Sequence, residues 1–567
     1  TEESEILLNE ELEELAWNQD TPLDPEATLK GMIKEADSIT DFNVYDKVPL
    51  STVKGPVLSS RWVLKPKGVE VKARVVVRGF EQAFTDVETA SPTPSLTTML
   101  TLLSLGVSTG MQINTGDVST AFLHAPLTEE VLVQPPKELI GTKYCPEGHC
   151  WRLKKALYGL RSAPLSWNKH ITEILTEKMG FRQSTTDACL FINDEKKIYL
   201  LLYVDDLLTL TKDDTDKDWL FNTLGSHVLL KHTGYLGPTT TLKFLGRQLT
   251  HRGDNILITS PPQYITDLLA MYNLDKCKPT TTTGNSIMKP TTEDEELLDK
   301  DEHSKYRTAV GKLQWLAGIR PDIDYATKEL ARGLQSPTTG HRTQLKHLLR
   351  YTSGTADMGL MLRPTYTLSP QHNKSLDIHV YCDSDWAGCK TTRKSTTGVI
   401  SQILGCTVQH CSRTQATIAL SSTESETYAI CTGLSEALYI KQLLLDLRLF
   451  TEVHIHIHTD NTGAKATAPR TGLSPRTKHM QLRYLWIQNC FNTGMAKLHK
   501  IASKENPGDL ETKYVLAEVL RYLLVKVGLV STTMVLSYCA EDDNITDNIT
   551  DNITDNITDN ITDNITD

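Results

Sequence analysis

Apolar runs of strand length and stretches of helical spacing alternate through the first half of the chain. Residues 198–204 and 207–210 are apolar runs separated only by Asp205 and Asp206, a pattern that predicts a β-hairpin with two acidic residues at its tip. A valine-rich run predicts a strand at 74–78, and helical spacing predicts helices at 96–105 and 166–179. Together these elements indicate an α+β domain of about 200 residues.

A second block follows a Thr- and Pro-rich connection at residues 278–292. Residues 306–351 have helical spacing that is broken at Arg320-Pro321 and near Ser336-Pro337. The pattern then predicts three strands, a helix and a further strand, at 379–381, 398–404, 407–411, 423–447 and 454–459. This order indicates a second domain, of the α/β class.

The two ends of the chain differ from its body. Residues 1–50 carry a formal charge of −11 and contain a helix-like stretch at 6–15, and we expect a loosely attached acidic leader. Residues 544–567 are six copies of Asn-Ile-Thr-Asp, which offer too little apolar surface to offset the entropy of ordering, so we expect disorder there. Residues 514–530 are apolar but contain Glu518, Arg521 and Lys526, which favours an amphipathic helix over a membrane span.

Composition and charge restrict the class of protein. The 567 residues are 39% hydrophobic and 23% charged, which fits a soluble chain of several domains and excludes a disulfide mini-protein. The net charge of −11 comes from the ends, because residues 51–540 have a formal charge of +9. A mildly basic body permits a polyanionic partner. Eleven cysteines without regular spacing, and an N-terminus unlike a signal peptide, favour a reducing intracellular compartment.

Three acidic residues of the first domain are candidate metal ligands. Asp205 and Asp206 lie at the predicted hairpin tip, and Asp117 follows a strand-like run at 111–114 that can face the hairpin across a sheet. Carboxylates held in this way bind Mg²⁺ with substrate phosphates completing its shell, and three of them suit two ions. Asp is also common in plain hairpin turns, so the pattern alone leaves both interpretations open.

The second domain contains another set of acidic residues. Asp383 and Asp460 each follow a predicted strand, and Glu426 lies in the first turn of the long predicted helix. Carboxylates at strand ends and a helix start can converge at one rim of a sheet, as a two-metal nuclease requires. Asp509 is a fourth candidate. Capping of turns by Asp383 or Asp460, and a capping box from Thr423 to Glu426, are the alternative interpretations.

Two further clusters contain residue types that bind metals. One lacks a second thiol pair at zinc spacing, and chance clustering in a loop is its better interpretation: Cys145, His149 and Cys150. The other is a strand on which imidazoles alternate with apolar residues, and a partly exposed sheet face is its better interpretation: His454, His456 and His458.

The sequence around the candidate acids resembles one family. Tyr203-Val204-Asp205-Asp206 is similar to the reverse transcriptase signature, and the chain resembles the polymerase of copia-type long-terminal-repeat retrotransposons from about residue 46 to 515. The similar segments are 72–80, 112–123, 157–164, 244–246, 306–307, 310–313, 320–323 and 349–351. Segments 381–388, 393–398, 421–426, 459–461 and 476–479 resemble the ribonuclease H domain of that family. The family's Ala-Asp-Ile-Leu-Thr-Lys stands here as residues 508–513, Gly-Asp-Leu-Glu-Thr-Lys, which leaves the exact placement of Asp509 open.

The resemblance implies a multidomain fold of the α+β and α/β classes. A right-hand polymerase with fingers, palm and thumb would be followed by a ribonuclease H-like α/β domain. The implied parts are a loosely ordered acidic leader at 1–45, fingers and palm at 46–275, a thumb or connection at 276–375, a ribonuclease H-like domain at 376–515, a C-terminal helix at 516–540 and disordered repeats at 541–567.

The resemblance also implies roles for individual residues. The polymerase metal ligands would be Asp117, Asp205 and Asp206. The nuclease ligands would be Asp383, Glu426, Asp460 and Asp509, with Asp385 and Glu424 as close competitors. Each site would hold two Mg²⁺ or Mn²⁺ ions. The nucleotide would contact Lys72, Arg74, Phe122, Tyr158, Gly159 and Arg161, with the Phe122 ring blocking the sugar 2′-hydroxyl.

The activity implied is RNA-directed DNA polymerisation combined with ribonuclease H cleavage. The implied partners are an RNA template, a DNA primer or RNA–DNA hybrid, dNTPs, and a separate integrase and capsid protein of the element, without a membrane. The implied location is a cytoplasmic virus-like particle or the nucleus. An inactive relic or a domesticated nucleic-acid-binding protein is the alternative, and the presence of all seven carboxylates favours activity.

Overall fold

The computed structural model describes residues 23–82, 90–285, 296–368, 374–470 and 486–532. The expected helix at 6–15, the motif at 476–479 and the repeats at 544–567 lie outside these residues. Among the described helices, none combines the length and the apolar character that crossing a membrane requires. Four sheets with helices packed on them make up the fold, and the expected combination of α+β and α/β classes is confirmed.

The first sheet has the strand order β1-β6-β5-β2-β3. One edge of it is an antiparallel hairpin of β2 (Val57–Lys67) and β3 (Glu70–Val77), turned by Gly68 at φ +63°. β1 (Tyr45–Pro49), β5 (Pro126–Gln134) and β6 (His149–Lys155) complete the sheet. Alternate residues of β3, from Val71 to Val77, are buried, so this strand has one face in the core.

Helix α2 (Pro25–Asp41) corrects the expectation of a loosely attached leader. The Asp24 carboxylate starts the helix by accepting a backbone N–H over 2.7 Å. Glu35, Ala36 and Ile39 are buried, and the helix packs against β3. The segment is therefore held from residue 24 onward, because its apolar stripe covers the edge strand of the first sheet.

The second sheet, called here the hairpin sheet, has the order β11-β4-β10-β9-β8-β7. β9 (Ile198–Tyr203) and β10 (Asp206–Thr211) form the predicted hairpin, and β10 also pairs antiparallel with β4 (Gln112–Val118). The other strands are β7 (Arg182–Gln183), β8 (Leu190–Asn193) and β11 (Leu230–Tyr235). Both helices predicted here are confirmed as α3 (Leu96–Thr109) and α4 (Ala163–Glu173), and α5 (Asp214–Gly225) follows β10.

The hairpin sheet separates two hydrophobic cores. Ile198, Leu200 and Leu202 of β9 lie in a core shared with the first sheet. Tyr199 and Leu201 of the same strand lie in a larger core that continues into the C-terminal half of the chain. The apolar run that predicted this strand is therefore continuous because both faces of the strand are buried.

The third sheet joins two distant parts of the chain in the order β12-β13-β14-β15-β21. Its first four strands are β12 (Thr241–Phe244), β13 (Arg247–Arg252), β14 (Asn255–Thr259) and β15 (Met358–Leu362). The helices between β14 and β15 are α6 (Pro262–Ala270), α7 (Lys300–Ala317), α8 (Pro321–Ala331) and α9 (Thr339–Gly354). Both predicted helix breaks are confirmed, because α8 begins at Pro321 and α9 begins after residue 338.

The helix expected at 516–540 is wrong at residues 527–531, and residues 533–540 lie outside the described part of the chain. Helix α13 (Ala517–Lys526) ends before Gly528, which has φ +80° and does not continue a helix. The chain then forms β21 (Leu529–Ser531), which pairs antiparallel with β15, and the Met361 amide donates to the Gly528 carbonyl over 2.8 Å. The edge of β15 pairs with these residues, so the apolar segment ends in a strand and not in a helix.

The fourth sheet, called here the mixed sheet, has the order β18-β17-β16-β19-β20. β16 (Ser375–Asp385), β17 (Thr396–Ile403) and β18 (Cys406–Thr414) are antiparallel, whereas β19 (Glu452–Thr459) runs parallel to both β16 and β20 (Ala496–Lys500). The long helix α10 (Ser422–Asp446) packs across the sheet, and α11 (Thr462–Thr467) and α12 (Trp486–Asn492) follow β19. The predicted order of three strands, a helix and a strand is confirmed.

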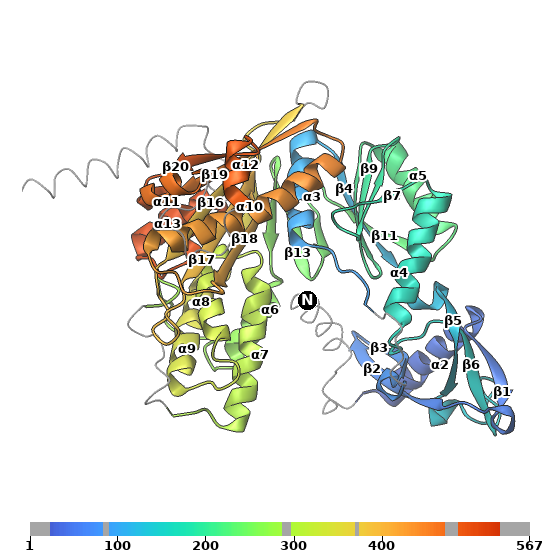
Figure 1. Ribbon diagram of the computed structural model, residues 1–567. Coiled ribbons are helices and arrows are strands. Elements are labelled where there is room, and N and C mark those ends of the chain that lie inside the picture. The colour runs from blue at the N-terminus through green and yellow to red at the C-terminus, as the bar shows by residue number, and fades with distance from the viewer. Residues whose placement is uncertain (1–22, 83–89, 286–295, 369–373, 471–485, 533–567) are drawn as a thin grey trace, which may run out of the picture.

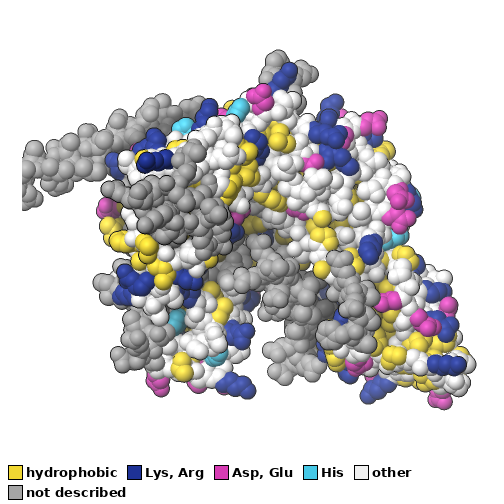
Figure 2. Space-filling view, in the orientation of Figure 1, with side chains coloured by type: hydrophobic (Ala, Val, Ile, Leu, Met, Phe, Trp, Pro, Cys, Tyr) yellow, Lys and Arg dark blue, Asp and Glu magenta, His cyan; other side chains and the backbone are white. Residues whose placement is uncertain are grey.

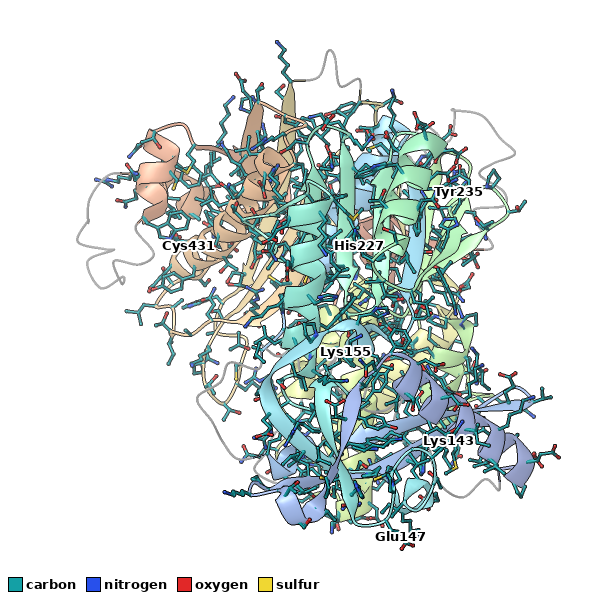
Figure 3. All side chains as sticks on the ribbon, turned by 90° about the vertical axis from the view of Figure 1, so that its right-hand side faces the viewer. Lys143, Glu147, Lys155, His227, Tyr235 and Cys431 are labelled. Atoms are coloured by element: carbon teal, nitrogen blue, oxygen red, sulfur yellow. The ribbon has the colours of Figure 1, made fainter. Side chains whose placement is uncertain are left out.

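The molecule has two arms that extend from a common upper part (Figure 1). The first sheet with α2 forms one arm, and α7, α8 and α9 form the other. Lys and Arg side chains lie on both arms in the face shown in Figure 2. In the turned view of Figure 3, Lys155 marks the place where the first sheet meets the hairpin sheet, and Cys431 of α10 lies apart from His227 and Tyr235.

A close backbone contact joins β3 to the segment after β6. The Val77 amide donates to the Tyr158 carbonyl over 2.8 Å, and Gly159 has φ +88°. A Cβ atom at position 159 would lie 2.1 Å from the Val77 carbonyl oxygen. Position 159 therefore requires glycine for its conformation and for space.

We expect Gly159→Ala to destabilise the fold by about 2 kcal/mol or more, because the backbone must shift to admit the methyl group. The matched control is Gly68→Ala, which also has positive φ but has no atom within 4 Å of the added Cβ. Gly68→Ala should lose only the free energy needed to hold alanine at positive φ, about 1 kcal/mol. Thermal unfolding midpoints of the two variants measure the difference, and equal shifts would contradict the steric argument.

Candidate active sites

Hydrogen bonds from two directions hold the tip of the β9–β10 hairpin. Trp167 donates from its ring Nε1 to the Val204 carbonyl over 2.6 Å, and the Val118 amide donates to the Asp205 carbonyl over 2.8 Å. Val204 has φ +49°, a conformation that is costly for a β-branched residue. These contacts hold the backbone in a strained turn at the point where it presents Asp205 and Asp206.

The strand register places two of the three predicted carboxylates opposite each other. Asp117 of β4 pairs with Asp206 of β10, so their side chains lie on the same face of the sheet, and Asp205 adjoins them at the turn. All three residues are half-buried, and the Ser119 hydroxyl donates to Asp117 Oδ2 over 3.3 Å. They do not form one of the groups, found among the described residues, whose ligand atoms all lie within 4.8 Å of one another.

Three of the predicted nucleotide-binding residues belong to a chain of contacts that starts on α2. Arg74 pairs with Glu35 at 2.8 Å and lies over the Tyr158 ring, 5.1 Å from its centroid. Phe122 meets the same ring edge-on, with 5.4 Å between the centroids. Burial raises the pKa of Tyr158 to about 12, and the charge of Asp205 adds to the shift. Sequence reasoning missed Glu35, because it lies in the segment expected to be loose.

The other predicted nucleotide-binding residues lie beside this chain of contacts. Lys72 is exposed and stands two residues before Arg74, so both lie on the same face of β3. Gly159 makes the close backbone approach described above, and the Arg161 amide donates to the Gln82 side chain over 2.9 Å. The two cations therefore differ, since Arg74 is paired with a carboxylate and half-buried while Lys72 is exposed to solvent.

The mixed sheet brings three predicted carboxylates together. Asp383 lies near the end of β16, Asp460 directly follows β19, and Glu426 lies on α10. β16 and β19 are parallel with Cys382 opposite Thr459, so the two aspartates leave adjacent strands at the same rim. One oxygen from each of the three side chains falls within a group whose atoms lie within 4.8 Å of one another.

The competitors Asp385 and Glu424 have other partners. Ser421 caps α10 by accepting the Glu424 amide, and the Glu424 carboxylate accepts from the Leu420 amide over 2.8 Å. Asp385 accepts from the Thr396 amide. Glu426 is not a capping residue, because its carboxylate points to the aspartates and its Oε2 is buried without a hydrogen bond. The geometry thus brings Asp383 and Glu426, and not these two neighbours, into the group of clustered carboxylates.

Asp509 stands beside the three clustered acids and is bridged to them by a lysine. It lies on the short helix η9 (Pro507–Glu511), and Lys513 Nζ is 2.8 Å from Asp509 Oδ1 and 3.8 Å from Asp383 Oδ2. The Thr512 hydroxyl donates to Asp383, and the Ser503 hydroxyl donates to Asp460. These three partners were not predicted from the sequence. The separation of four residues between Asp509 and Lys513 is a spacing at which helical side chains meet, and it could have indicated the lysine.

Crowding raises the pKa of two of these acids. Burial, together with the charges of Asp383 and Asp460, raises the pKa of Glu426 to about 9. Burial and Asp383 raise the pKa of Asp509 to about 7, against the opposing effect of Lys513. A buried set of carboxylate oxygens with too few hydrogen-bond donors fits a hard divalent cation such as Mg²⁺ or Mn²⁺.

The histidine strand is partly exposed, as expected. The exposed fraction of the His454 side chain is 48% and that of His456 is 17%. The His379 and His456 rings stack with their centroids 5.1 Å apart, and His456 Nδ1 lies 3.0 Å from His499 Nε2. Neither this strand nor the Cys145, His149 and Cys150 cluster appears among the tight metal-ligand groups of the described residues.

Comparison with known proteins finds similarity to a reverse transcriptase family model and to proteins of transposons. The family model for reverse transcriptase (RNA-dependent DNA polymerase) matches residues 42–285. The retrovirus-related Pol polyprotein from transposon TNT 1-94 of Nicotiana tabacum is 31% identical over 510 residues, which cover 86% of this chain and 36% of that protein. The corresponding polyprotein from transposon RE2 of Arabidopsis thaliana is 32% identical over 507 residues, covering 86% and 33%. A transposon Ty5-1 protein of Saccharomyces cerevisiae is 30% identical over 314 residues, covering 55% of this chain and 96% of that protein.

The chain spans about a third of the length of the two plant polyproteins. Among solved structures, a foamy viral protease-reverse transcriptase in complex with double-stranded DNA aligns with a TM-score of 0.49 and 12% sequence identity. The alignment covers 85% of this chain and 71% of that one.

We expect the metal-free chain to lose stability as the pH rises towards about 9. The pKa of Glu426 rises from 4.5 to about 9 on folding, so the folded chain holds this proton more tightly than the unfolded chain. Its contribution to stability is therefore complete below pH 4.5 and is lost as the pH rises through about 9. Thermal unfolding in a chelator measures the decline, and Glu426→Gln should flatten it.

Glu452→Gln, which removes an exposed acid of β19, is the control and should keep the slope of the parent chain. Added Mg²⁺ should raise the unfolding temperature most at high pH, where Glu426 is ionised. A profile that Glu426→Gln leaves unchanged would contradict the crowding argument.

Proposed function

The chain belongs to the reverse transcriptase family of copia-type retrotransposon Pol polyproteins, and from this premise we propose that it is an RNA-directed DNA polymerase with an attached ribonuclease H. It copies RNA into DNA at the hairpin sheet and degrades the RNA of the resulting hybrid at the mixed sheet. The observation that carries the proposal is the register of Asp117 with Asp206, beside Asp205, within the matched region.

In the polymerase site, Asp117, Asp205 and Asp206 are the proposed ligands of two Mg²⁺ or Mn²⁺ ions. Such ions, when bound, activate the primer 3′-hydroxyl and stabilise the pyrophosphate leaving group. The fold of the protein determines where these carboxylates lie. The strained turn at Val204 and its hydrogen bond from Trp167 hold them on a rigid sheet, which limits the reorganisation needed when substrate binds.

The contacts on β3 support a nucleotide pocket next to these acids. Arg74 is oriented by Glu35 and by the Tyr158 ring, and we assign it and Lys72 to the triphosphate of the incoming dNTP. The Phe122 ring stands edge-on to Tyr158, and we assign it to exclude a sugar 2′-hydroxyl. Gly159 and Arg161 follow Tyr158 and are proposed to complete the pocket.

In the nuclease site, the proposed ligands are Asp383, Glu426, Asp460 and Asp509. Bound Mg²⁺ or Mn²⁺ activates water for hydrolysis of a phosphodiester. Lys513 offsets part of the carboxylate charge, and the hydroxyls of Thr512 and Ser503 orient Asp383 and Asp460. The buried, unpartnered oxygen of Glu426 supports a cation at this position.

The proposed partners follow from the activity and from the basic body of the chain. They are an RNA template, a DNA primer or RNA–DNA hybrid, and dNTPs, with phosphate contacts that weaken as salt is added. An integrase and a capsid protein of the same element, and a location in a cytoplasmic virus-like particle or the nucleus, belong to the same proposal.

We expect Asp205→Asn/Asp206→Asn to reduce Mg²⁺-dependent extension of oligo(dT) on poly(rA) by more than about a hundredfold, because the amides remove the charge that holds the ions. Asp254→Asn is the matched control, since Asp254 is an exposed acid at the turn between β13 and β14. It should retain full extension. Extension that persists in the double variant would contradict the polymerase site, and a parent chain that binds hybrid without extending it would indicate an inactive relic.

We expect Glu426→Gln to abolish cleavage of the RNA in an RNA–DNA hybrid while primer extension continues. Glu424→Gln, two residues earlier on the same helix, should keep cleavage because that carboxylate contacts Leu420 and Tyr428. A labelled hybrid in which both activities are followed together measures the separation. Loss of cleavage in Glu424→Gln alone would transfer the ligand role to Glu424.

A further inference from the structure

A third cluster of potential ligands lies apart from both carboxylate sites. It contains Asp324 from α8, His410 from β18 and Glu511 from η9, three elements that meet where the helical arm contacts the mixed sheet. One ligand atom from each side chain belongs to a group within 4.8 Å. The side chains of His410 and Glu511 are buried, and the exposed fraction of the Asp324 side chain is 22%.

The imidazole of His410 faces both carboxylates with a single nitrogen. His410 Nδ1 lies 3.3 Å from Asp324 Oδ2 and 3.1 Å from Glu511 Oε1. The other ring nitrogen, Nε2, lies 3.3 Å from the Gly318 carbonyl oxygen. This is the arrangement of a metal-ligating histidine, in which a hydrogen bond from the second nitrogen to a backbone carbonyl sets the tautomer and the ring orientation.

Three polar atoms of this cluster, all on His410 and Glu511, are buried without a hydrogen bond of good geometry. The exposed fraction of the Glu511 side chain is 0%, and neither of its oxygens makes a hydrogen bond. His410 Nδ1 also makes no such hydrogen bond, although both carboxylates lie close to it. A buried carboxylate is costly unless it is paired or coordinates a metal, so the fully buried Glu511 carboxylate favours a bound cation among these three side chains.

We propose that Asp324, His410 and Glu511 bind a zinc-class divalent cation that joins the helical arm to the mixed sheet. Imidazole and carboxylate ligands lie about 2.1 Å from zinc, and two ligands in tetrahedral or octahedral positions are then about 3.0–3.4 Å apart. The distances of 3.1 and 3.3 Å from His410 Nδ1 to the two carboxylates match this spacing. The nitrogen ligand selects zinc over Mg²⁺, and the partly exposed Asp324 gives the ion a route to the site.

The test is zinc stoichiometry in the full chain with excess Mg²⁺ present to occupy the all-carboxylate sites. The chain is stripped with a chelator, given Zn²⁺, desalted and assayed for bound metal. Glu511→Gln and Asp324→Asn should each bind one zinc fewer than the parent chain. His456→Asn is the control, because its imidazole lies on the separate, partly exposed histidine strand, and it should retain this zinc.

A second readout keeps the test decisive if Glu511→Gln folds poorly. Zn²⁺ should raise the unfolding temperature of the parent chain and of His456→Asn, but not that of Asp324→Asn, whose changed side chain is partly exposed. Equal zinc content in the parent chain and Asp324→Asn, or a parent chain that retains no zinc, would overturn the proposal. The cluster would then be a buried ion triad with a protonated imidazole.

Discussion

Burial of the β9–β10 hairpin on both faces is the constraint on which the rest of the structure depends. Successive residues of β9 enter different cores, one shared with the first sheet and one shared with the C-terminal half. A slip of one residue would send Tyr199 and Leu200 into the wrong cores and move Asp206 out of register with Asp117. The packing of several hundred residues therefore determines where a few carboxylate oxygens lie.

Local patterns were enough to predict much of the fold. The hairpin, the helix breaks around α8 and the succession of three strands, a helix and a strand in the mixed-sheet domain each follow from signals within a few residues, as do the acids at strand ends and at the start of α10. Contacts between distant segments have no such signal. The pairing of Glu35 with Arg74 and the position of Lys513 between Asp383 and Asp509 depend on how elements pack. The strand after α13 was missed because its partner edge, β15, belongs to a remote part of the chain.

The short helix η9 shows how a small element can serve two acidic clusters. Asp509 faces the carboxylates of the mixed-sheet rim, and Glu511 faces His410 on the other side. This requires a close approach to β17, where a Cβ at Gly398 would lie 2.6 Å from the Gly508 carbonyl oxygen. The rim that carries the proposed nuclease and the contact with the helical arm are thus built on the same five residues.

The pairing of β21 with β15 has a topological consequence. The chain leaves the third sheet after Leu362 and returns to it at Leu529, so the mixed sheet and its helices form an insertion between two neighbouring strands. An insertion anchored at both ends does not depend on a single connector, and its hydrophobic core is continuous with that of α3 and the third sheet. In the proposed enzyme, this double attachment holds the polymerase site and the nuclease site at one separation. The length of RNA–DNA hybrid that lies between them is then fixed.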